Sequence, residues 1–302
     1  MSTTESLTIR QFQDMIAAPS LLLGFHPDDS CVVMAVRAGS ARRKAVLFCL
    51  RVDLDWYAAY FDQVAEQLYN AQLRAGPCEW ILIAYSASED DAEVALEELS
   101  EVLGGERVAV RLICDGNRYW PVGCPHDAVE YDFDSSALAA QAVYQGVSIQ
   151  RGRRATVAEV EAGVVDIGIW SDAVEEASAM SIDDKLALLR ALMEDAPDGE
   201  HAATRLAVLL QDEECFVAVL TELKTTNAER HFGMLTRARR SCPDEAAPNP
   251  LALLGLACWL AGRAAQHTAC LEQLARVDPE HPMLRLLLRL HRLAIPPAHW
   301  DD

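Results

Sequence analysis

The stretch Glu79-Trp80-Ile81-Leu82-Ile83-Ala84-Tyr85 is apolar at nearly every position. A strand with one exposed face alternates apolar and polar residues, whereas a strand covered on both faces is apolar almost throughout. This stretch therefore predicts a central strand buried on both faces. Ser88–Leu103 follows it with helical spacing, a serine cap and early acidic residues, and Gly104 ends it. Arg107–Cys114 is the next apolar run, so a strand–helix–strand unit is predicted at the centre of the sheet.

Two hairpins are predicted on either side of this unit. Ser30–Val36 and Lys44–Val52 are β-branched apolar runs, and the polar connector Ala38–Arg43 between them favours antiparallel pairing. Asp115-Gly116-Asn117 is a tight turn that leads into the strand Arg118–Val122. Helices are expected at Thr8–Ala18, Asp55–Arg74 and Ser135–Gln145. We therefore predict an α+β or α/β domain over residues 1–150, with a mixed sheet covered by helices.

The second part, residues 151–302, is predicted to be all helical. Its apolar segments have helical spacing, and Pro and Gly separate several of them. We place the domain boundary at the short basic segment Arg151–Arg154. The expected helices are Thr156–Val165, Asp172–Met180, Ile182–Asp195, Glu200–Leu210, Glu213–Leu223, Asn227–Arg240, Pro250–Ala261, Ala264–Val277 and Pro282–Leu293.

One pair of these helices has a tetratricopeptide-like pattern. Small residues surround a tight turn at Gly262, and Asp278-Pro279 closes the second helix. The neighbouring helices do not repeat this pattern at a fixed period, so it predicts a single unit within a helical bundle.

The composition limits which classes of partner the protein can bind and in which cellular compartment we expect it. The 302 residues carry a formal net charge of −20. General binding to nucleic acid or to an anionic membrane requires a positive field, so neither is expected. The longest apolar stretch, Leu251–Ala261, is too short to span a bilayer, and no signal peptide is recognisable. Nine cysteines, most of them within apolar runs, indicate free thiols in a reducing compartment, so we expect a cytoplasmic protein.

The charge is unevenly distributed along the chain. Thr156–Glu222 holds 16 acidic and three basic residues, whereas Leu223–Asp302 holds eight acidic and ten basic ones. Solvated helix faces explain such a pattern most simply; an acidic docking surface or a mimic of nucleic-acid charge is the alternative. A local basic patch around Arg237, Arg239 and Arg240 and on the helix Arg285–Arg292 also remains open.

No motif in the sequence identifies a reaction. It contains no phosphate-binding loop, dinucleotide fingerprint, zinc-protease motif, nucleophile elbow or calcium-binding loop. Cys124-Pro125-His126 offers two metal ligands, and a zinc site needs three or four. We therefore predict no catalytic residue, no metal and no cofactor.

The candidate ligand-binding residues gather around one loop. His26, Asp28, Asp29 and Ser30 lie before the first strand, and His26 with Asp28 can serve as an acid–base pair. The simpler alternative is a turn capped by an aspartate. Arg51 and Asp53 share one face of the second strand, where they can pair with each other or bind a ligand. Trp120, next to Tyr119 on a later strand, is a further candidate, although core packing is the simpler role for both aromatics.

The order of these motifs resembles the DUF4192 family, a domain of unknown function. The resemblance rests on Gly24–Ser30 before an apolar strand, Arg51–Leu54, the strand ending at Tyr85, Asp115–Trp120, and the ending Pro296–Trp300. It implies an actinobacterial or phage origin, which agrees with an excess of 23 arginines over three lysines. It implies no activity.

These observations favour a non-enzymatic interaction or regulatory protein. It would bind a protein partner, or a second copy of itself, through the helical domain or the acidic surface. A second hypothesis is a small-molecule or nucleotide-binding enzyme that uses the His26–Ser30 loop with Arg51 and Asp53. A third is a phage factor that takes over the host or blocks its defences.

Overall fold

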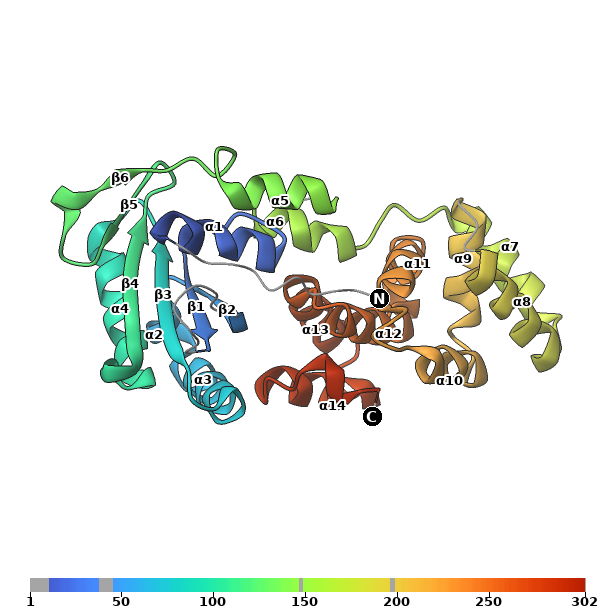
Figure 1. Cartoon of the computed structure of the whole chain (residues 1–302). Helices are drawn as coiled ribbons and strands as arrows, with labels where there is room; N and C mark the ends of the chain where they lie inside the picture. The colour runs from blue at the N-terminus through green and yellow to red at the C-terminus, as the bar shows by residue number, and fades with distance from the viewer. Residues whose placement is uncertain (1–10, 38–45, 147–148, 196–198, 302) are drawn as a thin grey trace. The chain divides into compact units, whose positions relative to one another are not determined.

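The computed structural model of the protein describes residues 11–37, 46–146, 149–195 and 199–301. The chain divides into two compact units (Figure 1). The N-terminal unit extends to Ala155 and includes Arg292–Ala294, and the helical unit holds Thr156–His291 and the residues from Ile295 onward. The predicted mixed sheet followed by many helices is confirmed. Within the described segments, no helix is long and apolar enough to cross a membrane.

The described strands of the N-terminal unit form one six-stranded sheet in the order β2-β1-β3-β4-β5-β6. Its strands are β1 (Ser30–Val36), β2 (Val46–Asp53), β3 (Glu79–Tyr85), β4 (Val108–Cys114), β5 (Arg118–Pro121) and β6 (Val129–Glu130). β3 and β4 are parallel, and all other neighbours are antiparallel. The two predicted hairpins are thus confirmed as β1–β2 and β4–β5. The connector Ala38–Arg43 and the start of the predicted second strand at Lys44 lie outside the described residues.

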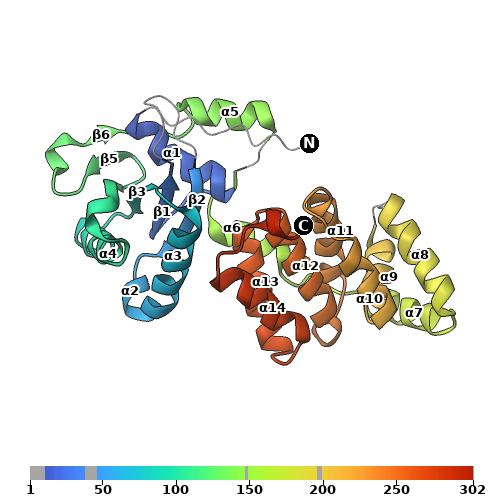
Figure 2. The ribbon, with the colours of Figure 1, turned by 60° about the horizontal axis from the view of Figure 1, so that its bottom comes forward.

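Helices cover both faces of this sheet (Figures 1 and 2). On one face lie α2 (Trp56–Ala59), α3 (Phe61–Ala75) and α4 (Glu89–Leu103), and on the other lie α1 (Phe12–Leu23) and α5 (Ala137–Gln145). Alternate side chains of β3 pack into the two layers: Trp80, Leu82 and Ala84 into the first, and Ile81, Ile83 and Tyr85 into the second. Burial on both faces is therefore the reason for the apolar run in β3.

The expected single helix Asp55–Arg74 is wrong, because it is interrupted at Tyr60. The backbone there leaves the helical conformation, with φ −137° and ψ 24°, and separates α2 from α3. The break allows the fully buried ring of Trp56 to stack on Phe61, with ring centroids 5.7 Å apart. Burial of Trp56 and its stacking on the partly exposed ring of Phe61 thus outweigh one continuous run of helical hydrogen bonds.

The first predicted helix also has different bounds. Thr8, where it was expected to begin, lies outside the described residues, and α1 continues past the expected end at Ala18 to Leu23. Pro19 lies inside the helix, although proline removes one hydrogen-bond donor there. Leu21–Leu23 pack against the core between the sheet and α1 and α5. Gly24, with φ +77°, ends the helix.

Residues from late in the chain complete the N-terminal unit. Arg292 donates to Glu66 of α3 at 2.8 Å, and Arg74 of α3 donates to the carbonyl oxygen of Leu293 at 2.9 Å. Ala294 packs against the core between the sheet and α2–α4. The outer face of α3 is therefore anchored by a segment more than 200 positions away in the sequence.

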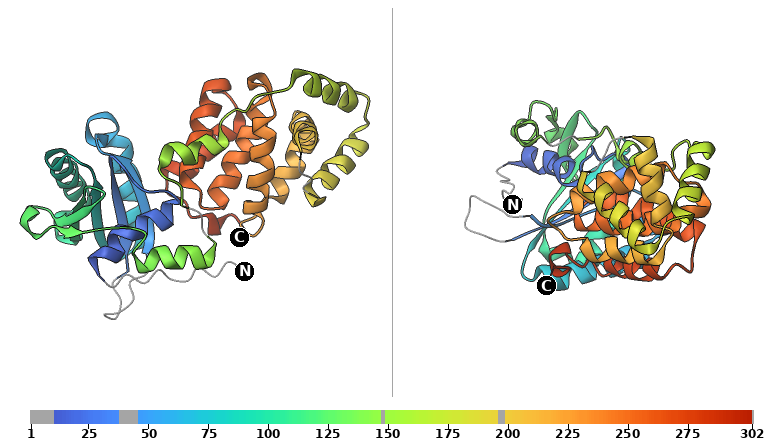
Figure 3. Two further views of the ribbon diagram at one scale, coloured as in Figure 1. Left: turned by 90° about the horizontal axis from the view of Figure 1, so that it is seen from above. Right: turned by 90° about the vertical axis from the view of Figure 1, so that its right-hand side faces the viewer.

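The helical unit contains eight longer helices within the described residues (Figure 3). They are α7 (Ile167–Ser178), α8 (Ile182–Asp195), α9 (Glu200–Leu209), α10 (Glu213–Glu222), α11 (Ala228–Arg240), α12 (Pro248–Leu260), α13 (Ala264–Val277) and α14 (Pro282–Arg292). α7 packs on α9, α9 on α11, α11 on α12, and α12 on α13. α8 packs on α9 and α10. One extended core of mostly aliphatic side chains joins these helices.

The expected helix Thr156–Val165 is wrong in its second half. α6 (Arg153–Val157) continues as a 3-10 turn, η3 (Ala158–Val160), and the chain is then irregular up to Asp166. Gly163 lies so close to the carbonyl oxygen of Arg240 that a Cβ atom would fall far inside van der Waals contact. This close approach of two backbone segments requires an extended crossing in place of a helical turn.

A segment that we call the C-terminal strap, Ile295–Asp301, holds part of the helical unit together. The indole Nε1 of Trp300 donates to the carbonyl oxygen of Leu223 at 3.0 Å, and the Nε1 of Trp259 donates to Ile295 at 3.1 Å. The two indole rings meet edge to face with centroids 5.9 Å apart. The strap thereby fastens the end of α10 to α12.

Candidate functional site

Most of the predicted site residues lie at one edge of the sheet. Ser30, at the start of β1, is paired with Asp53 at the end of β2 and with Tyr85 at the end of β3. Tyr85 is paired in turn with Cys114 at the end of β4. This is the carboxyl edge of the parallel pair β3–β4, the edge at which α/β sheets commonly bind ligands.

His26 is held by neighbours other than Asp28. Its Nδ1 lies 3.2 Å from the hydroxyl oxygen of Ser20, and its ring meets Phe133 edge to face with centroids 4.7 Å apart. Partial burial lowers the pKa of His26, and the nearby Asp134 partly opposes this shift. The imidazole is therefore neutral near pH 7, and its geometry is that of an anchored loop residue.

Asp28 and Asp29 serve mainly to shape the loop. Both are exposed, and a carboxylate oxygen of Asp28 accepts from the backbone N–H of Asp29 at 3.1 Å. Asp29 has φ +39°, a left-handed conformation that aspartate tolerates better than most residues. Its carbonyl oxygen accepts from the N–H of Leu54 at 3.2 Å, which ties the loop to the end of β2. Among the described contacts, no hydrogen bond joins His26 to Asp28.

Arg51 and Asp53 form an ion pair on one face of β2. A second guanidinium nitrogen of Arg51 lies 3.5 Å from the carbonyl oxygen of Asp28, at the limit of a hydrogen bond. Arg51 is 15% exposed and Asp53 is 54% exposed, so the pair extends from the protein interior to the solvent. The structure thus brings Arg51, Asp53 and the loop together, with the arginine largely occupied by protein partners.

Two buried polar atoms in this cluster have no protein partner. The hydroxyl of fully buried Ser30 and the Nε of Arg51 make no hydrogen bond to any described residue. Strand pairing places Ser30 opposite Asp53, so Ser30, Arg51 and Asp53 share the sheet face that α1 covers. The cluster therefore contains two buried groups that can still donate a hydrogen bond, and they lie beside the exposed carboxylate of Asp53.

Trp120 does not converge on this cluster. It is paired with Ile113 on β4, and both side chains pack in the layer between the sheet and α2–α4. That layer is on the opposite face from Arg51 and Asp53. Side chains alternate between faces along each strand, and the face of a short, late strand was not evident from its sequence. Trp120 and its neighbour Tyr119 are both buried, which agrees with core packing.

The segment Cys124-Pro125-His126 is exposed throughout. Over the described part of the chain, no three His, Cys, Asp or Glu side chains gather in a group that could hold a metal ion.

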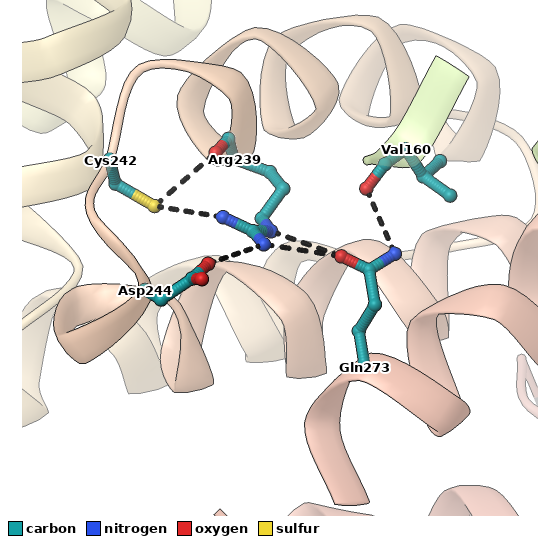
Figure 4. A network of polar contacts seen from close by, with 5 residues as sticks. All are labelled: Val160, Arg239, Cys242, Asp244 and Gln273. Atoms are coloured by element: carbon teal, nitrogen blue, oxygen red, sulfur yellow. Dashed lines mark hydrogen bonds and ion pairs between the residues drawn. The ribbon is translucent and has the colours of Figure 1, made fainter. Parts of the chain in front are cut away.

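Of the arginines considered for a basic patch, Arg239 is buried, Arg237 is half-buried and Arg240 is exposed. Arg239 is only 3% exposed and donates to Asp244 at 2.9 Å and to the amide oxygen of Gln273 at 3.2 Å (Figure 4). The amide nitrogen of Gln273 then donates to the carbonyl oxygen of Val160 at 3.2 Å. Arg239 is therefore a buried link between α11, α13 and η3, and not part of a binding surface.

Sequence reasoning missed an exposed strip on α7. The helix begins at Ile167, five residues before its expected start, because Asp166 caps it by accepting from Gly168 and Ile169. Ile167, 64% exposed, and Val174, 39% exposed, lie two turns apart on one face. The spacing Ile167, Ser171, Val174 and Ser178 repeats every three or four residues, and this pattern would have revealed the strip had the cap been recognised.

Acidic side chains border this α7 strip. Asp172 and Glu175 lie beside Ser171 and Val174 on the same helix, and both are exposed. Neither forms an ion pair with any described residue, whereas Glu176 on the inner side is paired with Arg205. The strip is thus an apolar seam with unpaired carboxylates along one flank.

The sequence model of the family described as "Domain of unknown function (DUF4192)" matches residues 13–298. No curated protein and no solved structure matches the chain.

Proposed function

Because the chain belongs to the DUF4192 family, whose description specifies no activity, we propose from the geometry alone that it is a non-enzymatic protein-binding module. In this proposal the helical unit docks a protein partner on the α7 strip, defined by Ile167, Ser171, Val174 and Ser178. The nine free thiols support a cytoplasmic location, since an oxidising compartment would favour disulfides.

The exposed aliphatic side chains of the α7 strip carry this proposal. Protein-binding helices commonly present apolar residues at three- and four-residue spacing, with charged residues at the rim that select the partner. Ile167 and Val174 have the first property, and Asp172 and Glu175 have the second. A solvated helix face would place polar residues at the two aliphatic positions.

The arrangement of α12 and α13 supports the same function. They are consecutive, packed helices joined by Ala261–Arg263, and Gly262 adopts φ +74° in the turn. This hairpin supports the single tetratricopeptide-like unit that the sequence predicts, and helix pairs of that kind serve as scaffolds for binding proteins and peptides.

Partner capture from native cells tests the proposal. The full chain, the double variant Ile167→Ser/Val174→Ser, and a matched control Val143→Ser/Tyr144→Ser on exposed positions of α5 would be compared. We expect one protein set to be captured by the wild type and the control but lost with the α7 variant. Identical capture by all three proteins would contradict the proposal.

A further inference from the structure

We propose that the partner seated on the α7 strip is the α14 face of a second copy of this chain, so that copies associate head to tail. The inference rests on the proposed function, because it assigns an occupant to the same strip. It arises from two exposed helix faces of opposite charge within one helical unit.

The two faces lie at opposite ends of the helical unit. The helices pack in the order α7, α9, α11, α12 and α13, so α7 is at one end (Figures 2 and 3). α14 is at the other end, where Leu287 contacts Gly255 of α12 closely and His291 lies beside His267 of α13. A contact between α7 of one copy and α14 of another therefore joins unlike ends.

The α14 face is apolar and basic. Leu288 is 39% exposed and shares the outer side of the helix with two arginines, whereas Leu286, 36% exposed, lies at the opposite margin of that side. Arg285 and Arg289, one turn apart, flank Leu288 and are exposed. Among the described residues, the ion pair at this end of the helix is that of Arg292 with Glu66, which leaves the exposed Arg285 and Arg289 available to a partner.

The α7 face is its counterpart in chemistry and in length. It presents Ile167 and Val174 with Asp172 and Glu175, so an aliphatic strip with two negative charges is matched by Leu288 with two positive charges. α7 has 12 residues and α14 has 11, so the two helices can lie along each other over their whole lengths. Opposite charges at the rim of the contact fix the orientation of α7 on α14, and they disfavour contacts between two α7 faces or two α14 faces.

Charge also selects this occupant over a two-fold pairing of identical faces. Two α7 strips face to face would bring Asp172 and Glu175 of both copies together, and two α14 faces would do the same with Arg285 and Arg289. Like charges across an interface strongly disfavour association. The net charge of −20 opposes indiscriminate association, so only a contact with local complementarity is expected to form. An unlike-end contact generates rings or open chains.

Charge reversal tests the contact in the full-length protein by sedimentation velocity over a concentration series. One variant is Asp172→Arg/Glu175→Arg, and the other is Arg285→Glu/Arg289→Glu. We expect the wild type to associate as concentration rises and each variant alone to associate more than about tenfold more weakly. An equimolar mixture of the two variants should regain association, because each reversed end then meets a reversed partner.

The controls separate this inference from the proposed function. Glu98→Arg/Glu101→Arg on α4 reverses two charges at the same spacing and should leave association unchanged, and circular dichroism checks that all variants fold. A wild type that is monomeric at every concentration, or a mixture that stays dissociated, overturns the inference. If capture of another protein still depends on Ile167 and Val174, the proposed function survives that result.

Discussion

Gly163 lies where a side chain would meet the carbonyl oxygen of Arg240. We expect Gly163→Ala to destabilise the protein by about 2 kcal/mol, because two backbone segments must separate to admit the methyl group. The midpoint of urea unfolding measures this change.

Gly233 in α11 is the matched control. A Cβ there would approach nothing closer than 4.0 Å, and alanine is a better helix former than glycine by about 1 kcal/mol. Gly233→Ala should therefore stabilise the same helical unit. Destabilisation of similar size in both variants would refute the account of Gly163.

His267 makes stability depend on pH. Its Nδ1 lies 2.8 Å from the carbonyl oxygen of Gly255, and burial lowers the pKa of His267 from 6.5 to about 4. Between these values the unfolded chain binds a proton that the folded chain does not, so stability falls as pH decreases from about 6.5 to 4. The full effect is at most about 3 kcal/mol.

The variant His267→Gln isolates this contribution, since glutamine can donate to Gly255 but does not titrate. Urea midpoints at pH 7 and pH 5 should differ less in the variant than in the wild type. An unchanged difference would assign the acid sensitivity to other groups, such as His291, whose pKa burial also lowers.

At the scale of elements, Arg239 is expected to be the main polar link of the helical unit. Arg239→Ala removes the donors to exposed Asp244 and to buried Gln273, and we expect a loss of about 2 kcal/mol, mainly because the Gln273 amide oxygen is left without a partner. Arg190→Ala on the exposed face of α8 should have little effect. Thermal unfolding of both variants provides the comparison, and equal melting temperatures would contradict a structural role for Arg239.

The C-terminal strap gives a second prediction at this scale. Trp300→Ala removes the hydrogen bond to Leu223 and the ring contact with Trp259, so a loss of about 2 kcal/mol is expected. Tyr144→Ala, on a ring that is 91% exposed, controls for the loss of an aromatic residue. Comparable stability of the two variants in denaturant would mean that the strap is dispensable.

Elements with one strong local signal were predictable from the sequence, and those decided by tertiary contacts were not. The apolar run of β3 and the turn before Arg118 located the sheet and one hairpin. The break at Tyr60 depends on the stacking of Trp56 on Phe61, which no local pattern encodes. At the sheet edge, the two-residue spacing of Arg51 and Asp53 predicted their pairing, but the face occupied by Trp120 depends on the register of β5 with β4.

For the whole molecule, the rate at which the cysteine thiols react measures how deeply those side chains are buried. Burial raises the pKa of Cys31 and of Cys49 to about 12, and that of Cys114 to about 11, so reactive thiolate is scarce in the folded protein. Cys124 is exposed. We expect about one thiol to react rapidly with a disulfide reagent at pH 8, and all nine after unfolding. Several fast-reacting thiols in the folded state would contradict the burial described.

The positions of Arg292–Ala294 and of the C-terminal strap affect how the chain can fold during synthesis. Domains generally fold in the order in which they leave the ribosome. Here the sheet emerges early, but the anchor on α3 is absent until residue 294 has been made, and the end of α10 is not fastened until residue 300 follows. Both units should therefore reach their final stability only after residue 300 has been made. Chains truncated before residue 292 should be more sensitive to protease than the 302-residue chain.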